Sequence, residues 1–268
     1  LMSILRTGMD SEWIRGKLEW ELDTYGNRTG KVLFNKDSSG FWLILENFGV
    51  PLEIENLYVA GIDDVYKDKA PHSESKNCMV IYMRDSIHAE AEMADLPVCF
   101  YLGRHGNRML DYAEFHKATL FYNCWNMYEH NDSAGFIGYA REHGISKNFI
   151  YHNGQIGIRL SDDTIADMTL LGLKYFEEDR HLRIFHSSVI ECFKYWNSGI
   201  NSDLASAFHL VLFGLNKLKK KGTWSEADER LNKGKPKQPT PINFFERTNV
   251  NSTIQFGKPS TNLIVSWN

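Results

Sequence analysis

The stretch LYVAGI at residues 57–62 is the first of three short apolar segments that decide the fold, followed by CMVIYM at 78–83 and PVCFYL at 97–102. Each segment is bounded by polar residues and has the length and composition of a buried strand. Strands that follow one another without an intervening helix pair as an antiparallel meander. The three segments therefore predict the antiparallel part of a sheet.

Helical and strand patterns alternate after this meander. Apolar residues recur at helical spacing over 108–126, a short strand ends near 128, a helix over 134–143 is stopped by Gly144, and 148–153 predicts a fifth strand. Strands joined through helices are parallel. This order is the topology of the ribonuclease H-like fold. We therefore predict an α/β protein whose mixed sheet, a three-strand antiparallel meander plus two parallel strands, is flanked by helices.

Further patterns lie on both sides of these elements. Helices are predicted at 162–179, 187–196 and 202–220, and the residues before 57 alternate as β-hairpins do. We expect a β-hairpin lead-in at 1–56, a core at 57–221 and a Lys/Pro-rich loop with a C-terminal extension at 222–268. The last helix is the most periodic, with one apolar face made of Leu204, Ala207, Phe208, Val211, Leu212, Leu215 and Leu218.

Composition excludes several classes of protein. With 268 residues, 43% of them apolar, the chain can bury a core, and its net charge of −4 restricts nucleic-acid binding to local patches. No apolar run approaches the roughly 20 residues of a membrane span, and no signal-peptide pattern opens the chain, so we expect a soluble intracellular protein. The cysteines show no zinc spacing and predict buried thiols in a reducing compartment: Cys78, Cys99, Cys124 and Cys192.

Carboxylates stand at the ends of three predicted elements. Asp63 follows the first core strand, Glu129 follows the fourth, and Asp203 begins the last helix. Parallel neighbours end at the same sheet edge, so Asp63 and Glu129 are expected to meet. Clustered carboxylates raise each other's pKa unless a cation lies among them, and oxygen ligands favour Mg²⁺ or Mn²⁺. Two such ions support phosphodiester hydrolysis, which is the reaction class that we predict.

Structural interpretations compete with these roles. Asp203 could be a helix N-cap and Asp63 a turn residue at a strand end. Asp162 and Asp163 compete with Asp203 for the third position, although a loop and helix cap also explains them.

Other polar residues are candidates for supporting roles. Asp64, His130 and Asn131 could contact the metal ligands, the attacking water or a phosphate, but each could equally be a solvated or capping residue. A basic stretch could contact DNA phosphates, or could be a solvated helix end that the helix dipole favours: Lys217, Lys219, Lys220 and Lys221, with Lys233, Lys235 and Lys237 beyond.

Three segments resemble the acidic motifs of the nuclease domain of tailed-phage large terminases: LYVAGIDD at 57–64, MYEHNDSAGFIGYAREHG at 127–144 and NSDLASAFHLVLFGL at 201–215. In that family an Asp ends the first strand, a Glu, any residue and an Asn precede a Gly that opens a helix, and an Asp begins an Ala-rich helix. The resemblance implies a two-metal endonuclease that cuts concatemeric double-stranded phage DNA during packaging. It also implies that Asp63, Glu129 and Asp203 are the catalytic metal ligands.

The same resemblance implies the portal and the small terminase subunit as partners, and the cytoplasm of a bacterial host as the location. The chain departs from the family because it has no G-x-x-x-x-G-K-[ST] motif: GNRTGKV at 26–32 is one residue short between its glycines and lacks the Ser or Thr. We therefore expect an excised nuclease domain without ATPase activity. Ser202 also stands where the family often has a second acid. The alternatives are a resolvase-type nuclease of the same fold and a non-catalytic DNA- or portal-docking module.

Overall fold

The computed structural model describes residues 13–54, 56–64, 75–85, 94–130, 135–178, 186–193, 196 and 202–220, apart from the side chains of 219 and 220. The chain divides into one compact unit over Leu1–Asn232 and a second over Lys233–Asn268. The second unit lies wholly outside the described residues.

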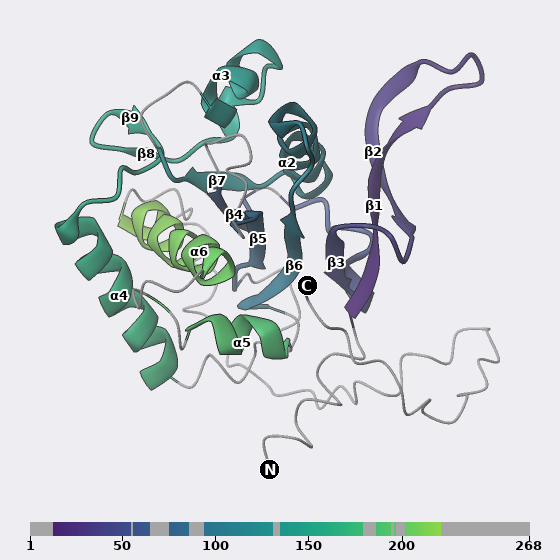
Figure 1. Ribbon diagram of the computed structural model, residues 1–268. Coiled ribbons are helices and arrows are strands. Elements are labelled where there is room, and N and C mark those ends of the chain that lie inside the picture. The colour runs from purple at the N-terminus through teal and green to yellow at the C-terminus, as the bar shows by residue number, and fades with distance from the viewer. Residues whose placement is uncertain are drawn as a thin grey trace, which may run out of the picture. The chain divides into compact units, whose positions relative to one another are not determined.

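A seven-stranded mixed sheet forms the centre of this unit (Figure 1). Its meander consists of β4 (Tyr58–Asp63), β5 (Asn77–Met83) and β6 (Leu96–Gly103), which pair antiparallel, while β7 (Trp125–Tyr128) pairs parallel to β4. The strand order is β2-β1-β3-β6-β5-β4-β7. The three apolar segments are therefore the predicted meander, and the ribonuclease H-like fold class is confirmed by the pairing itself.

The predicted fifth strand at 148–153 is interrupted. Phe149 and Ile158 each form a single parallel bridge, to Asn126 and Glu129, on the far side of β7. Between the two bridges the chain makes a small hairpin from β8 (Tyr151–His152) and β9 (Gln155–Ile156). The turn of this hairpin, Asn153 and Gly154, has the positive φ angles of 49° and 79° that a tight two-residue turn requires. The edge of the sheet is parallel, as predicted, but the strand is not continuous.

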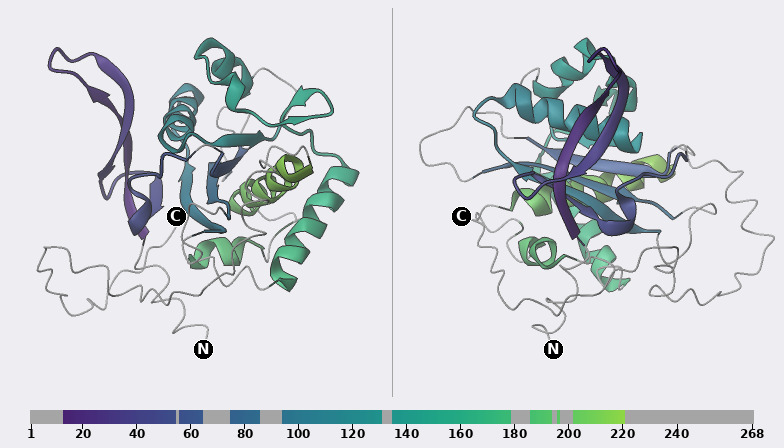
Figure 2. Two further views of the ribbon diagram at one scale, coloured as in Figure 1. Left: turned by 180° about the vertical axis from the view of Figure 1, so that it is seen from behind. Right: turned by 90° about the vertical axis from the view of Figure 1, so that its right-hand side faces the viewer.

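The lead-in strands extend the same sheet. The long hairpin of β1 (Trp13–Leu22) and β2 (Arg28–Lys36) projects from the edge (Figure 2). β3 (Trp42–Leu45) pairs antiparallel with both β1 and β6, and a short 3-10 helix, η2 (Glu46–Phe48), follows it. The predicted hairpin pattern is thus present, and its strands are hydrogen-bonded to the core strands.

Helices cover both faces of the core strands (Figures 1 and 2). α2 (Arg108–Tyr122) lies on one face, and its N-cap Asn107 accepts a hydrogen bond from the Met109 N–H. α3 (Gly135–Glu142) and the 3-10 helix η4 (Ser146–Asn148) follow β7. α6 (Asp203–Lys220) covers the other face, with α4 (Asp162–Glu177) and α5 (Ser187–Phe193) packed against it. No helix in the described ranges is long and apolar enough to span a membrane.

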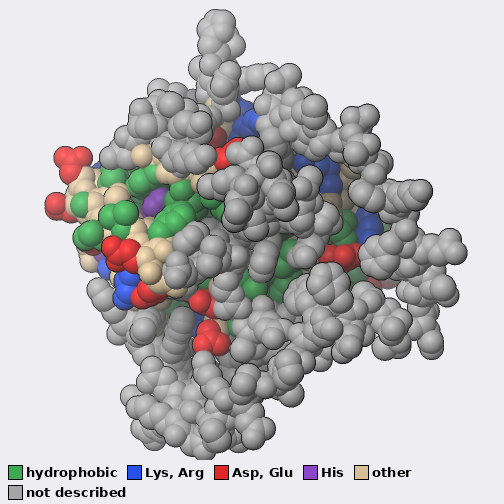
Figure 3. Space-filling model, turned by 90° about the horizontal axis from the view of Figure 1, so that it is seen from below, with side chains coloured by type: hydrophobic (Ala, Val, Ile, Leu, Met, Phe, Trp, Pro, Cys, Tyr) green, Lys and Arg blue, Asp and Glu red, His purple; other side chains and the backbone are tan. Residues whose placement is uncertain are grey.

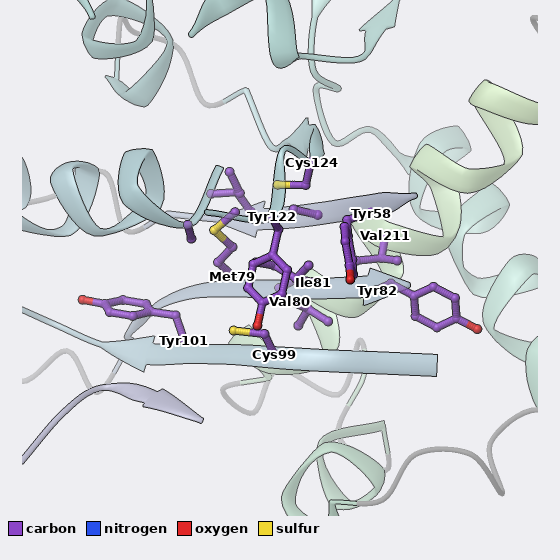
Figure 4. Close-up of a cluster of buried hydrophobic side chains, with 14 of the residues drawn as sticks. Tyr58, Met79, Val80, Ile81, Tyr82, Cys99, Tyr101, Tyr122, Cys124 and Val211 are labelled. Atoms are coloured by element: carbon purple, nitrogen blue, oxygen red, sulfur yellow. The ribbon is translucent and has the colours of Figure 1, made fainter. Parts of the chain in front are cut away.

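The core between β4, β5 and β6 is rich in aromatic and sulfur-containing side chains (Figure 4). Tyr58 packs edge-on against Tyr122 at 5.1 Å between ring centroids, and the Tyr122 hydroxyl donates to the Phe48 carbonyl at 3.1 Å. Cys78, Cys99 and Cys124 are buried free thiols, whereas Cys192 is only partly buried, so the prediction of buried thiols holds for three of the four.

α6 packs directly on the backbone of β4. A Cβ atom at Gly61 would lie 2.0 Å from the Ala207 carbonyl oxygen and 2.7 Å from the Val211 nitrogen, so only glycine allows this approach. α6 is also buried on more sides than the predicted apolar face, because α4 and α5 cover one side of it and Leu210 and Phe213 pack on another side with Val59, Met127 and Ile150. The additional buried residues are Ala205, His209, Leu210 and Phe213.

Replacing Gly61 by Ala should therefore lower the free energy of unfolding by about 3 kcal/mol, the upper part of the range for overpacked cores, since the obstructing atoms are backbone. Gly106→Ala is the matched control, because a Cβ there would meet nothing within 4 Å, and it should change stability by less than about 0.5 kcal/mol. Chemical denaturation of the two variants measures both effects. Equal stabilities would show that α6 does not approach β4 this closely.

His209 packs between α6 and its neighbours Gly172 and Trp196. Its ring stacks on Trp196 at 3.9 Å between centroids, its Nδ1 lies 2.8 Å from the Ala205 carbonyl oxygen, and it is 2% exposed. Burial lowers the pKa of His209 from its usual 6.5 to about 4. The native state therefore keeps this ring neutral at a pH where the unfolded chain takes up a proton.

This depressed pKa predicts a specific pH dependence of stability. The contribution of His209 is fully present above pH 6.5 and is lost as the pH falls toward 4, by about 3 kcal/mol in all. A His209→Gln variant should be less stable than the parent at pH 7. The difference in the free energy of unfolding should decrease as the pH falls from 6.5 toward 4. Denaturation at a series of pH values measures it, and parallel curves for parent and variant would contradict the prediction.

Candidate functional site

Asp63 and Glu129 lie at the same edge of the sheet. Asp63 ends β4, and Glu129 directly follows β7, the parallel neighbour of β4. The Glu129 N–H donates to the Ile62 carbonyl at 3.1 Å, so the parallel pairing continues to the residue beside Asp63. Glu129 is 8% exposed. The structure thus brings these two predicted residues together, as expected for strands that end side by side.

Asp203 reaches the same edge from the first turn of α6. The Ser206 side chain, one helical turn further on, hydrogen-bonds to Asp63. The Asp203 Oδ2 atom accepts a hydrogen bond at 2.6 Å from the N–H of Lys76, the residue just before β5. β5 is the strand in which Cys78 is paired with Asp63. The Asp203 carboxylate therefore binds to a neighbouring element, whereas an N-cap would bind to its own helix.

The three carboxylates act on one another electrostatically. Burial, followed by the charges of Glu129, Asp203 and Asp64, raises the pKa of Asp63 well above its usual value of 3.8, and the hydrogen bond from Ser206 opposes this effect. The nearby charges of Asp203 and Asp63 also raise the pKa of the buried Cys78 thiol, after burial itself. Negative charge is thus concentrated around the end of β4.

The donor set fits a hard divalent cation, since it consists of carboxylate oxygens at one edge. Within the described ranges, however, no three Asp, Glu, His or Cys side chains are gathered closely enough to hold an ion as they stand. The two observations are compatible because charges influence a pKa over many ångströms, whereas metal ligands lie about 2.0–2.6 Å from the ion. Binding would require the carboxylates to draw together around a positive charge.

Asp64 lies beside Asp63 but belongs to the opposite face of the sheet. Successive strand residues alternate, and the Asp64 Oδ2 atom accepts a hydrogen bond at 3.0 Å from the Tyr112 hydroxyl of α2. Tyr128 also hydrogen-bonds to this carboxylate. Burial raises the pKa of Asp64, while the two tyrosines and the charge of Arg108 lower it. Its Oδ1 atom is buried and has no hydrogen-bond partner among the described residues.

The other predicted supporting residues lie near Glu129. The His130 N–H donates to the Ile158 carbonyl at 2.7 Å, and its Nδ1 atom is buried with no hydrogen-bond partner in the part of the chain that the structure describes. Asn131 lies outside the described residues.

The competing acids and the basic stretch lie elsewhere. Asp162 and Asp163 are exposed in the first turn of α4, where Ser161 forms a capping box with Thr164. Lys217 lies over the Phe213 ring at 4.8 Å, near the end of α6. At 1.5 Å per residue, it is about 20 Å along the helix axis from Asp203. The side chains of Lys219 and Lys220, and the whole of Lys221, lie outside the described residues.

Basic side chains are also mixed with acidic ones on the face drawn in Figure 3. In the coloured part of that view, Lys and Arg side chains are interspersed with Asp, Glu and hydrophobic side chains and form no continuous basic patch.

Ser206, Tyr112 and Tyr128 are the site residues that the sequence did not predict. Ser206 carries a local signal, since it lies three positions after Asp203 and thus on the same side of the helix. The two tyrosines carry none, because they meet Asp64 only through the packing of α2 on the sheet.

Comparisons with known proteins find a likeness in fold. No family model matches the chain, and no curated protein matches it. Two solved structures of the large terminase nuclease from thermophilic phage G20c, one with bound magnesium and one with bound zinc, are similar with a TM-score of 0.46 and 9% identity, and cover 78% of this chain and 95% and 96% of theirs. A third structure of that nuclease has a TM-score of 0.45 and 8% identity, and covers 77% of this chain and 96% of its own.

Proposed function

We propose that this chain is a divalent-metal-dependent nuclease that hydrolyses phosphodiester bonds in double-stranded DNA. The observation that carries the proposal is that β4 and β7 end side by side with Asp63 and Glu129 at one sheet edge, which Asp203 of α6 reaches through its hydrogen bond from the Lys76 N–H. An arrangement of this kind destabilises the native state, and strongly perturbed carboxyl groups at the end of a strand are typical of functional sites. A bound cation offsets this repulsion.

The three acids share one role in the proposed site. Asp63, Glu129 and Asp203 would hold the metal. Two bound Mg²⁺ or Mn²⁺ ions would activate a water and stabilise the attacking and leaving oxygens of the phosphodiester. The hydrogen bond from Ser206 orients Asp63, and the Lys76 N–H orients Asp203, so that both carboxylates are positioned by elements of the rigid core.

The biological substrate is proposed from the three acidic segments, which resemble those of large terminase nucleases. We infer that the DNA is a concatemeric phage genome, that portal and small terminase subunit are partners, and that the chain has no ATPase activity of its own. Asp203 is the preferred third ligand because its charge acts on Asp63, whereas Asp162 and Asp163 are exposed and lie in the capped first turn of α4.

Conservative substitutions test the catalytic assignment. In Mn²⁺ or Mg²⁺, Asp63→Asn, Glu129→Gln and Asp203→Asn should each lower the rate of plasmid cleavage by about a hundredfold or more, a typical loss for one group that supports charge development in the transition state. The double variant Asp162→Asn/Asp163→Asn is the matched control and should cut at the parent rate. Cleavage by Asp203→Asn at the parent rate, with loss in the control, would move the third ligand to α4.

The choice of DNA separates the alternatives. Cleavage of linear duplex without sequence preference supports the proposed function, whereas a strong preference for four-way junctions would identify a resolvase. DNA binding without cleavage in either ion would identify a docking module and contradict the proposed chemistry.

Metal binding should also stabilise the fold. An ion present at about 100 times its dissociation constant contributes about 2.7 kcal/mol, which raises the melting temperature of a unit of this size by about 5–10 °C. Asp63→Asn should abolish this rise. In chelator at pH 7 the same variant should be more stable than the parent, because one of the mutually repelling charges is gone.

The pH dependence provides a check on that stability gain. Since the pKa of Asp63 is raised in the native state, this carboxyl contributes stability at low pH that is lost as the pH rises through its folded pKa. The advantage of Asp63→Asn should therefore shrink as the pH falls. An advantage that is the same at pH 4 and pH 7 would show that the acids do not repel one another.

A further inference from the structure

A second polar cluster lies around Asp111, on the α2 side of the same sheet edge. Asp111, in α2, is 0% exposed, yet its two carboxylate oxygens accept hydrogen bonds from two strands. The Tyr101 hydroxyl of β6 lies at 2.5 Å and the Asn77 amide of β5 at 2.7 Å. The His105 backbone N–H lies 3.2 and 3.3 Å from the same two oxygens, and the His105 Nδ1 atom lies 2.8 Å from Oδ1. This buried carboxylate is therefore fully hydrogen-bonded.

The cluster determines the orientation of one imidazole ring. Every acceptor position of Asp111 is directed to a donor, so Nδ1 of His105 carries the hydrogen that faces the carboxylate, and Nε2 is the nitrogen left for another partner. Phe41 packs edge-on against the ring at 4.9 Å between centroids. The side chain of His105 is nevertheless 25% exposed, against 1% for that of Asp111.

A purely structural clasp explains only part of this arrangement. Asp111 stabilises the turn between β6 and α2 through the His105 backbone N–H, and any residue at position 105 except proline would supply that donor. Burying a carboxylate is costly. A histidine ring held by a carboxylate on one nitrogen is typical of histidines whose other nitrogen has a partner.

His105 lies close to the proposed nuclease site along the sheet edge. Asp63, Cys78 and Leu102 are paired in register across β4, β5 and β6, so the end of β6 is two strand spacings, roughly 10 Å, from Asp63. The charge of Arg108, in the first turn of α2, also acts on Asp64. Since phosphates of one strand advance about 3.4 Å along the duplex axis, a DNA strand that lay along this edge from Asp63 toward β6 would span the distance in about three phosphates.

We propose that His105, oriented by Asp111, binds a backbone phosphate of the DNA strand a few nucleotides from the bond that is cut. The inference rests on the proposed nuclease function and adds a substrate-binding residue to it. A phosphate oxygen only accepts hydrogen bonds, so Nε2 would be the donor to it while Nδ1 faces Asp111. His105 thus positions the strand and takes no part in the bond cleavage.

The test measures DNA affinity in an Asp63→Asn background, in which cleavage is expected to be at least about a hundredfold slower. Adding His105→Ala should weaken binding of duplex DNA about tenfold and reduce the slope of log affinity against log salt by about one. His105→Arg should restore most of both, since its charge can reach the same phosphate. His143→Ala, which removes an exposed histidine after α3, is the matched control and should change neither. In the cleaving parent, His105→Ala should raise KM and leave kcat within about twofold.

Three outcomes distinguish the possible failures. If His105→Ala lowers the melting temperature but leaves DNA affinity and salt slope unchanged, His105 is only part of the turn and the inference is wrong, while the nuclease function stands. A loss of kcat with unchanged KM would also overturn it, because the residue would then act on the chemical step. If the Asp63→Asn protein binds no DNA and the parent cuts none, both the inference and the proposed function are wrong.

Discussion

The contact between α6 and β4 at Gly61 is the constraint on which the candidate site depends. Strand pairing alone brings Asp63 and Glu129 together, since the two strands are neighbours in the sheet. Asp203 arrives by a different route, on a helix that can approach only because no side chain stands between the two backbones. The same approach lets Ser206 reach Asp63. The absence of a side chain at Gly61 thus determines how close Asp203 comes to Asp63, a residue far from it in the chain.

The edge of the sheet separates two kinds of charge. On the α6 side, burial and then the charges of Glu129, Asp203 and Asp64 raise the pKa of Asp63. On the α2 side, the Tyr112 hydroxyl donates to one oxygen of the buried Asp64, and both oxygens of the buried Asp111 meet donors, from Tyr101, Asn77 and His105. A carboxylate that accepts several hydrogen bonds stabilises the fold, whereas one that is repelled by neighbouring negative charges is stabilised when a cation binds. The α6 face therefore suits the binding of a cation, whereas the α2 face holds the framework and orients His105, the residue proposed to bind a phosphate.

Much of the fold could be predicted because it is encoded locally. Continuous apolar runs gave β4, β5 and β6, and the rule for parallel strands placed Asp63 beside Glu129. The hairpin that interrupts the fifth strand was also marked, since Asn153–Gly154 is a strong turn signal at the end of the segment 148–153 that was interpreted as one strand. What could not be predicted is where α2 and α6 cross the sheet. The partners of Asp64 and Asp203 follow from those crossings and from no nearby spacing.

The hydrogen bond from Lys76 to Asp203 joins residues 127 positions apart, which has a consequence for the order of folding. Closing so large a loop is entropically costly and contributes a high contact order, so such contacts form late. The meander and α2 can assemble from a chain that ends near residue 130, but the third carboxylate arrives only after α6 has been synthesised and has docked. A nascent chain on the ribosome therefore carries two acids without the third. The site that we propose for DNA cleavage is therefore complete only after α6 has docked on the sheet.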